Sequence, residues 1–293
     1  MTYGRPGVYI SETLLPAPVV TVGTANAAGG AIGAFAQGPT SLTLVTSWYD
    51  FVKKFGGFNA AYPATFGVNQ FFLNGGSELY VKRIVGTGAS AATADIPPAS
   101  GLTAVATVNA RNVGSAGNNL RIRISKSGTI AGTGGPVSLY NLSVYQEVLS
   151  QYLGTSNTNG VNDILVESYD NLNFTDSTSP DYYANVVNAL SESIVIVGAT
   201  AIAPAVQSLS NVIPLAQTGT PVNHGDGSAP TAAQYAAAFT TDGTSEFDTV
   251  EHPLVVFAPE LWAKFTVDGN SGAAADFAVV ADAMTNWAKT GMG

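Results

Sequence analysis

The segment from Leu44 to Val85 constrains the fold more than any other part of the chain, because two helix signals and a strand signal follow one another closely. Ser47, with Asp50 three residues later, is an acidic variant of a capping box and predicts a helix N-terminus there. The apolar residues that follow recur at helical spacing and form one stripe, which consists of Trp48, Phe51, Val52 and Phe55. Gly56 and Gly57 then end the helix, because glycine adopts a left-handed conformation without a Cβ clash.

A second helix is predicted from about Ala64, and Asn74, Gly75 and Gly76 end it in the same way. The residues from Glu78 to Val85 are rich in β-branched and aromatic side chains, which is typical of a strand. The simplest interpretation of the whole segment is two helices that pack on a core strand.

The same segment resembles the signature of contractile tail sheath proteins, which form the sleeve around the tube of contractile phage tails and related injection systems. The resemblance is carried by VTSWYDFVKKFGG and, after a short linker, FFLNGGSELYVKRIV. Three further stretches resemble the family in the same order within the first 125 residues: RPGVYISET, VGTANAAGGAIGAFAQGPT and NVGSAGNNLRIRIS. The resemblance selects as core signature residues Trp48, Phe51, Phe55, Gly56, Gly57, Phe71, Phe72, Asn74, Gly75, Gly76, Tyr80 and Arg83.

We predict an α/β fold with a mixed α+β core domain, an inserted β-rich domain and an extended N-terminal arm. The arm covers residues 1–22, the core covers 23–88 and 231–293, and the inserted domain covers 89–230 with a helix near 180–193. Pro16 and Pro18 keep the arm from forming a helix. In sheath proteins such arms add a strand to a neighbour's sheet, and the resemblance implies this role for Val8, Tyr9, Ile10, Val19, Val20 and Val22. Pairing of the arm with its own core is the alternative.

Local patterns predict the remaining elements. Short strands are expected near 104–109, 120–125, 139–145 and 164–167, and Leu120, Ile122 and Ile124 alternate with Arg121 and Arg123 as in a half-buried strand. Pro180 is placed at the first position of a helix. Capping signals at Thr231 and Gln234 precede another helix, residues 254–257 suit a buried strand of a parallel or mixed sheet, and a last helix begins near Gly272.

Composition favours a subunit that buries surface against copies of itself. Charged residues make up 11% of the 293 residues, against a usual share of ~25%, while hydrophobic residues make up 46%. The chain has no cysteine, which excludes disulfides and thiolate metal sites. Its first residues lack the features of a signal peptide, and its longest apolar run is too short to span a bilayer.

The charges are unevenly placed along the chain. Residues 1–160 contain nine of the eleven Lys and Arg but five of the twenty Asp and Glu. One interpretation is that the basic part of one subunit meets the acidic part of a neighbour. The other is that both parts interleave within one fold, so that the asymmetry averages out.

Candidate chemical groups are few. His224 lies in a polar Gly-rich turn and His252 precedes a proline, and neither has a convincing catalytic partner in the sequence. The acidic run Asp242, Glu246, Asp248 and Glu251 is interpreted as a solvated face rather than a pair of glycosidase carboxylates. The glycines at 128–135 lack a P-loop lysine, and the basic residues Lys53, Lys54, Lys82 and Arg83 suit a subunit contact better than nucleic acid.

We therefore expect no catalytic residues, no metal and no cofactor. The resemblance implies a structural subunit that stacks in rings around the tail tube and contracts to drive the tube through an envelope. It implies as partners further copies of the chain, the tail tube protein, and the baseplate and tail terminator proteins, with no direct nucleic acid and no membrane insertion. It places the protein in the virion tail after assembly in the host bacterial cytoplasm.

Sheath proteins continue into a C-terminal domain that this sequence does not contain, so we expect a fragment or a short member. The alternative function is a β-domain protein that binds or hydrolyses polysaccharide.

Overall fold

The computed structural model describes residues 28–101, 103–132, 135–147, 163–208, 212–215, 225–240, 244–251, 253–261 and 273–290. The predicted arm, including Val8, Tyr9, Ile10, Val19, Val20 and Val22, lies outside the described residues, as do His224 and His252.

A four-stranded mixed sheet forms the centre of one packed unit, which we call the core. Its strand order is β11-β1-β3-β2, with bounds Leu254–Phe257, Ala28–Gly33, Leu79–Arg83 and Thr43–Val45. The first strand, β1, runs parallel to both β11 and β3, whereas β2 is antiparallel to β3. This mixed sheet confirms the predicted α/β class.

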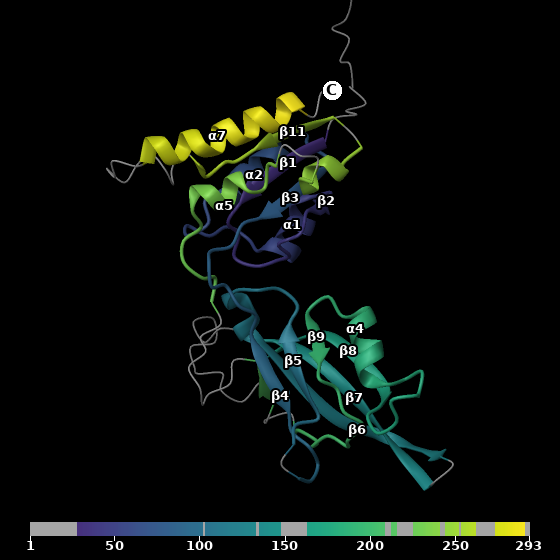
Figure 1. Ribbon diagram of the computed structural model, residues 1–293. Coiled ribbons are helices and arrows are strands. Elements are labelled where there is room, and N and C mark those ends of the chain that lie inside the picture. The colour runs from purple at the N-terminus through teal and green to yellow at the C-terminus, as the bar shows by residue number, and fades with distance from the viewer. Residues whose placement is uncertain are drawn as a thin grey trace, which may run out of the picture.

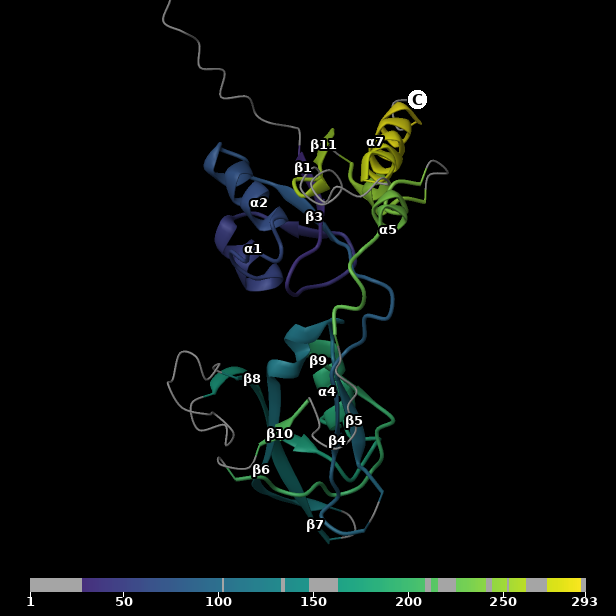
Figure 2. The same cartoon turned by 90° about the vertical axis from the view of Figure 1, so that its left-hand side faces the viewer.

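Helices cover both faces of the core sheet (Figures 1 and 2). On one face lie α1 (Trp48–Phe55) and α2 (Ala64–Leu73), and on the other lie α5 (Ala232–Ala236) and α7 (Ala273–Thr290). Neighbouring residues of β1 divide between the two faces: Ala31 packs with α1 and α2, and Ile32 packs with α5 and α7. The sheet is therefore the middle layer of a three-layer unit.

The helix α1 is capped at both ends, but its N-terminus has only one of the two hydrogen bonds of the predicted capping box. Ser47 Oγ accepts a hydrogen bond from the Asp50 N–H at 3.1 Å, and the Gly56 N–H donates to the Val52 carbonyl at 3.0 Å with Gly56 at φ +92°. The Asp50 carboxylate accepts from the Thr46 N–H at 3.4 Å rather than from Ser47, so the cap is not reciprocal. These local bonds fix where the first signature helix begins and ends.

Aromatic rings of the signature pack into one cluster. Phe51 and Phe55 are fully buried, and their ring centroids lie 5.3 and 5.6 Å from that of Phe35. Phe71 is partly buried and lies so close to the backbone that a Cβ at Gly76 would be 2.3 Å from its ring. Glycine at position 76, shortly after the end of α2, thus leaves space for the ring of Phe71.

A second packed unit, which we call the β-rich unit, contains two antiparallel sheets and one α-helix among the described residues. One sheet has the order β10-β6-β7-β8 and the other β4-β5-β9. Their bounds are Ile213–Pro214, Leu120–Gly132, Gly135–Gln146, Ile164–Asn173, Thr93–Ile96, Ala106–Ala110 and Ile194–Val197. A 3₁₀ helix, η1 (Ser115–Asn119), precedes β6, and α4 (Tyr183–Leu190) packs on β8 and β9.

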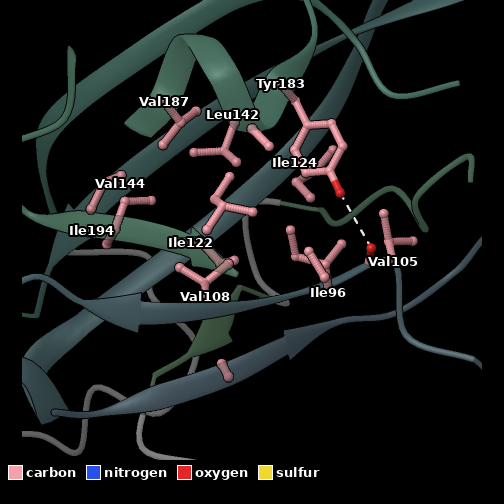
Figure 3. Packing of buried hydrophobic residues seen from close by; sticks show 14 of the residues in the cluster. Ile96, Val105, Val108, Ile122, Ile124, Leu142, Val144, Tyr183, Val187 and Ile194 are labelled. Atoms are coloured by element: carbon pink, nitrogen blue, oxygen red, sulfur yellow. Dashed lines mark hydrogen bonds between the residues drawn. The ribbon is translucent and has the colours of Figure 1, made fainter. Parts of the chain in front are cut away.

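The two sheets of the β-rich unit share one hydrophobic core (Figure 3). Ile122, Ile124 and Leu142 from the longer sheet are fully buried with Val108 of β5. Tyr183 of α4 is also buried there, and its hydroxyl donates to the Val105 carbonyl at 3.2 Å. Burial raises the pKa of Tyr183 above its ordinary value, so this donor stays protonated at neutral pH.

Three sequence predictions are wrong in detail. Pro180 is not in a helix: α4 begins at Tyr183, because residues 173–182 form a series of side-chain and backbone turns. The strand β11 pairs in parallel as expected, but it is the outer strand of its sheet, and Val255 is exposed. Arg121 is buried rather than exposed, because it pairs with Glu147 and Asp163 at the ends of β7 and β8.

The buried hydrophobic side chains of the described residues form three clusters. Two of them combine residues of 31–84 with residues of 232–287, and the third contains residues of 91–215. The exact limits of a core at 23–88 and 231–293 and of an insertion at 89–230 stay a prediction. None of the helices in the described part of the chain combines the length and the hydropathy that a membrane-spanning segment requires.

Candidate functional site: the junction of the core and the β-rich unit

Two chain segments lead from the core to the β-rich unit and run side by side (Figures 1 and 2). They are residues 84–90 and 225–231, and backbone hydrogen bonds join them in both directions. The Gly86 N–H donates to the Asp226 carbonyl at 3.2 Å, and the Ser228 N–H donates to the Thr87 carbonyl at 3.0 Å. We call this crossing, with the turn at 113–115 that touches it, the junction.

Glycine allows the two segments to approach this closely. A Cβ at Gly86 would lie 1.5 Å from the Ser228 carbonyl oxygen, a distance that no side chain can occupy. Gly227 has φ +76°, and a Cβ there would lie 2.6 Å from the Thr87 carbonyl oxygen. Both positions therefore require glycine for the backbones to pair.

Arg83, the last residue of β3, binds both units at the junction. Its guanidinium donates to the carbonyls of Phe35 at 3.0 Å and Gly38 at 3.0 Å in the core. It also donates to the Val113 carbonyl of the β-rich unit at 2.7 Å and pairs with the Asp226 carboxylate at 3.2 Å. With 2% of the residue exposed, the charge is held by four oxygen acceptors rather than by water.

Asp226 is the second centre of the junction. Its carboxylate accepts from the Tyr62 hydroxyl at 2.9 Å, from the Ser115 hydroxyl at 2.8 Å and from the Ser115 N–H at 3.2 Å. Gly114 has φ +116°, and a Cβ there would lie 2.4 Å from this carboxylate. One side chain on the returning segment therefore ties the loop before α2 to the turn before β6.

The junction changes the proton affinities of its members. Burial lowers the pKa of Arg83 from its ordinary value, and the charge of Asp226 opposes that shift, so the guanidinium stays charged. Burial also raises the pKa of Tyr62, and its hydrogen bond to Asp226 adds to the shift. Tyr62 is therefore a protonated donor throughout the neutral range.

A cleft of about 930 Å³ lies beside the junction, between the two units. The core contributes Lys53 and Lys54 of α1, and the β-rich unit contributes Arg111, Glu167 and Glu192. Both signs of charge occur on its walls. Within the described residues no group of three or more His, Asp or Glu is arranged to hold a metal ion.

Glu167 is held by four donors on the wall of this cleft. Ser191 Oγ, Ser193 Oγ, the Tyr169 hydroxyl and the Glu192 N–H lie 2.6, 2.7, 2.9 and 3.0 Å from its carboxylate oxygens. Burial favours the neutral acid and raises the pKa of Glu167, but these hydrogen bonds outweigh burial, so its pKa is lowered overall.

We predict that Glu167→Gln removes an acid-sensitive part of the stability. Because the pKa is lower in the folded state, the ionised carboxylate stabilises the fold above its unfolded pKa, and this contribution is lost as pH falls through the folded pKa. Denaturant unfolding from about pH 7 to about pH 3 should show a gap between wild type and variant that narrows on acidification. Asp170→Asn, an exposed carboxylate on the same strand, is the control. A gap independent of pH would contradict the prediction.

The predicted signature residues differ in how far they are buried in the structure. Phe51, Phe55 and Arg83 are buried, Trp48, Gly56, Gly57, Phe71, Phe72, Gly76 and Tyr80 are half-buried, and Asn74 and Gly75 are exposed. Of these residues, Arg83 reaches the junction. Asp226, Tyr62 and Ser115 were not predicted, because nothing local in the sequence marks them as partners of an arginine. The only signal was the Gly-rich turn that contains Gly114, which the resemblance had selected.

Basic and acidic parts of the sequence meet within one chain. Lys82 pairs with Glu246, Arg83 with Asp226 and Arg121 with Asp163, and each pair joins residues 1–160 to residues 161–293. Of the two interpretations of the charge asymmetry, these pairs fit interleaving in one fold. They also show that Lys82 and Arg83 do not form an open basic patch, and Lys54 pairs with Asp50.

Comparison with known proteins gives structural matches alone. No family model matches the chain, and no curated protein matches it in sequence. A sheath tail protein from Listeria innocua is similar in structure with a TM-score of 0.48 and 13% identity, covering 88% of this chain and 44% of that one. A sheath tail protein from Desulfitobacterium hafniense is similar with a TM-score of 0.40 and 15% identity, covering 79% of this chain and 42% of that one. The chain thus spans less than half the length of these proteins.

Proposed function

We propose that this protein is a structural subunit of a contractile tail sheath, which polymerises in stacked rings around a tail tube. The observation that carries the proposal is the junction. Arg83 belongs to the stretch YVKRIV and Gly114 to the stretch NVGSAGNNL, two of the stretches through which the sequence resembles sheath proteins. In the fold both lie against the same carboxylate, that of Asp226.

The proposed mechanism is mechanical. A sheath that contracts must move its subunits without unfolding them, so each subunit has to act as a rigid body. The junction suits this requirement, because paired backbones and the ion pair of the buried Arg83 with the partly exposed Asp226 hold the β-rich unit on the core. We propose that contraction draws its energy from better packing between subunits in the contracted lattice.

We also propose the division into a core, an inserted β-rich domain and an arm that serves the polymer. The core would form the contacts between neighbouring subunits of one ring, and residues 1–22 would add a strand to the sheet of a neighbouring subunit. An edge strand pairs through its backbone. A link of this kind between two subunits therefore tolerates rotation of one subunit relative to the other. Neighbouring rings would stay connected while the lattice shortens. The proposed partners beyond further copies are the tube, baseplate and terminator proteins.

Electron microscopy of the protein expressed from its complete gene tests the proposal. Rings or tubes that shorten on triggering are the expected result. Val8→Pro with Ile10→Pro removes two strand N–H donors and should abolish long tubes, whereas Val8→Thr with Ile10→Thr keeps both donors and should not. Unchanged tubes in the proline variant would reject the arm, and a protein that forms no ring or tube would reject the sheath function.

A further inference from the structure

The outer strand of the core sheet, β11, has an open edge. It pairs with β1 on one side, and within the described residues no strand pairs with its other side. The strand reads LVVF and carries no charge, and Val255 is 67% exposed. Natural sheets cover or blunt such edges, because an apolar edge strand presents its backbone N–H and C=O groups to any other strand. The edge of β11 is therefore a site for one more strand.

The contacts of β11 with β1 identify which of its backbone groups face outward. The Ala28 N–H donates to the Pro253 carbonyl at 2.9 Å, so that carbonyl points toward β1. Backbone groups of successive residues in a strand point to opposite edges. The N–H and C=O groups of Leu254 and Val256 therefore lie on the open edge, and those of Val255 face β1. A partner strand has to bond with positions 254 and 256.

The segment that precedes β1 in the chain ends close to this edge. Strands β1 and β11 run parallel from the same end of the sheet, where Ala28 lies beside Leu254. Residues 19–22 read VVTV, and such β-branched residues are typical of a strand. This short segment has the same number of residues as β11.

The connection between the two positions is long enough. Five residues, GTANA at 23–27, separate residues 19–22 from Ala28. An extended chain of this length spans up to about 20 Å, whereas the path from β1 past β11 to the open edge is two strand spacings, or about 10 Å. Glycine and asparagine in the connection favour a turn. A linker this short also keeps the segment at a high effective concentration beside its own sheet.

We propose that residues 19–22 pair with β11 of the same molecule as a fifth strand of the core sheet. A segment that ends beside the start of β1 runs toward that end of the sheet, so the new strand is antiparallel to β11. Full pairing of the two segments places Val22 opposite Leu254 and Val20 opposite Val256. The backbone groups of Val20 and Val22 then meet those on the open edge.

The same register suits the side chains. Residues directly opposite each other in an antiparallel pair share a face of the sheet. Val20 and Val22 therefore join Leu254 and Val256, which pack against the apolar cluster under α5 and α7. Thr21, the polar residue of the segment, lies opposite the exposed Val255 on the other face. Apolar side chains thus meet the buried face, and the hydroxyl lies on the solvated one.

With the sheath function proposed above, this pairing divides the arm into two parts. Residues 19–22 belong to the sheet of their own subunit, and the strand-forming residues 7–10 are left to reach a neighbour. Pro16 and Pro18 lie between the two parts. Proline beside an edge strand opposes further pairing, so the sheet ends at residues 19–22.

A pair of engineered cysteines tests the register, because the chain has no cysteine of its own. Thr21 and Val255 form a non-hydrogen-bonded pair in the proposed register, and the Cα spacing of such a pair, about 4.5 Å, suits a disulfide. Oxidation of Thr21→Cys with Val255→Cys should form a disulfide within one molecule. Val20→Cys with Val255→Cys is the control, because the side chain of Val20 lies on the opposite face. Equal linkage of the two pairs, as for an arm without a fixed partner, would overturn the proposal.

A mixing experiment distinguishes the molecule's own arm from that of a second copy. Thr21→Cys and Val255→Cys proteins are purified separately, mixed and oxidised, and they should give little mixed dimer. A mixed dimer that forms faster than the disulfide within the double variant would assign the edge to a neighbour's arm and overturn the proposal.

A proline variant tests the backbone pairing itself. In the double-cysteine protein, Val22→Pro removes a donor that faces β11 and should slow linkage about fivefold or more, as expected for the loss of one hydrogen bond. Val22→Thr keeps that donor and should leave the rate unchanged. Equal rates for the two variants would contradict the pairing. Tubes formed by a protein without the linkage reject this strand alone, whereas linkage in a protein that forms no ring or tube rejects the sheath function alone.

Discussion

Replacing Phe55 with alanine is expected to lower the free energy of unfolding by ~3–5 kcal/mol, the cost typical of removing a buried phenylalanine. Phe55 is fully buried at the end of α1 and contacts the rings of Phe35 and Phe51. A Cβ at Gly38 would lie 2.6 Å from the Phe55 ring, so the backbone of the neighbouring loop closes tightly over it. Alanine would leave a cavity that this rigid backbone cannot fill.

Denaturant unfolding at neutral pH measures this effect, with Tyr49→Ala as the matched control. Tyr49 is an aromatic residue of the same helix but is 79% exposed, so its removal should change stability by about 0.5 kcal/mol or less. Similar losses for the two variants would show that α1 does not pack on the core sheet through Phe55.

Replacing Arg83 with methionine is expected to cost ~3–5 kcal/mol, because it leaves buried carbonyl groups without a donor and the 31% exposed Asp226 side chain without its cation. The carbonyls of Phe35, Gly38 and Val113 lose their donor, and Asp226 loses the cation beside it. The loss should fall on the attachment of the β-rich unit to the core. Limited proteolysis should therefore cut the variant within residues 84–90 or 225–231 before either unit is degraded.

A double replacement separates the ion pair from simple loss of packing. Asp226→Asn in the Arg83→Met background removes the unpaired charge and should recover part of the lost stability, so the two effects are not additive. Lys54→Met breaks an ion pair with Asp50 that is partly exposed, and it should cost about 0.5 kcal/mol or less. Additive losses at Arg83 and Asp226 would contradict the assignment of the junction as one coupled network.

Sequence patterns were sufficient to predict those structural features that depend on residues close together in the chain. The helix caps at Ser47, Gly56 and Thr231 depend on groups within a few residues of one another, and each was predicted and is present. The alternation of Ile122 and Ile124 with their neighbours gave the strand β6, because side chains of a strand alternate between two faces. The α/β class followed from the same local periods.

Only the tertiary structure decided which distant groups meet. Arg83 and Asp226 are 143 positions apart, and their pairing depends on the parallel placement of β3 beside β1 and on the return of the chain at 225–231. The same holds for the buried Arg121 and for β11, an apolar strand at the edge of its sheet. The sequence by itself determined the elements and the residues able to fill a core, because those depend on short-range periodicity and capping. The fold alone determined which charges are buried, which edges are open and which aromatic residues remain exposed, because those depend on contacts between residues far apart in the chain.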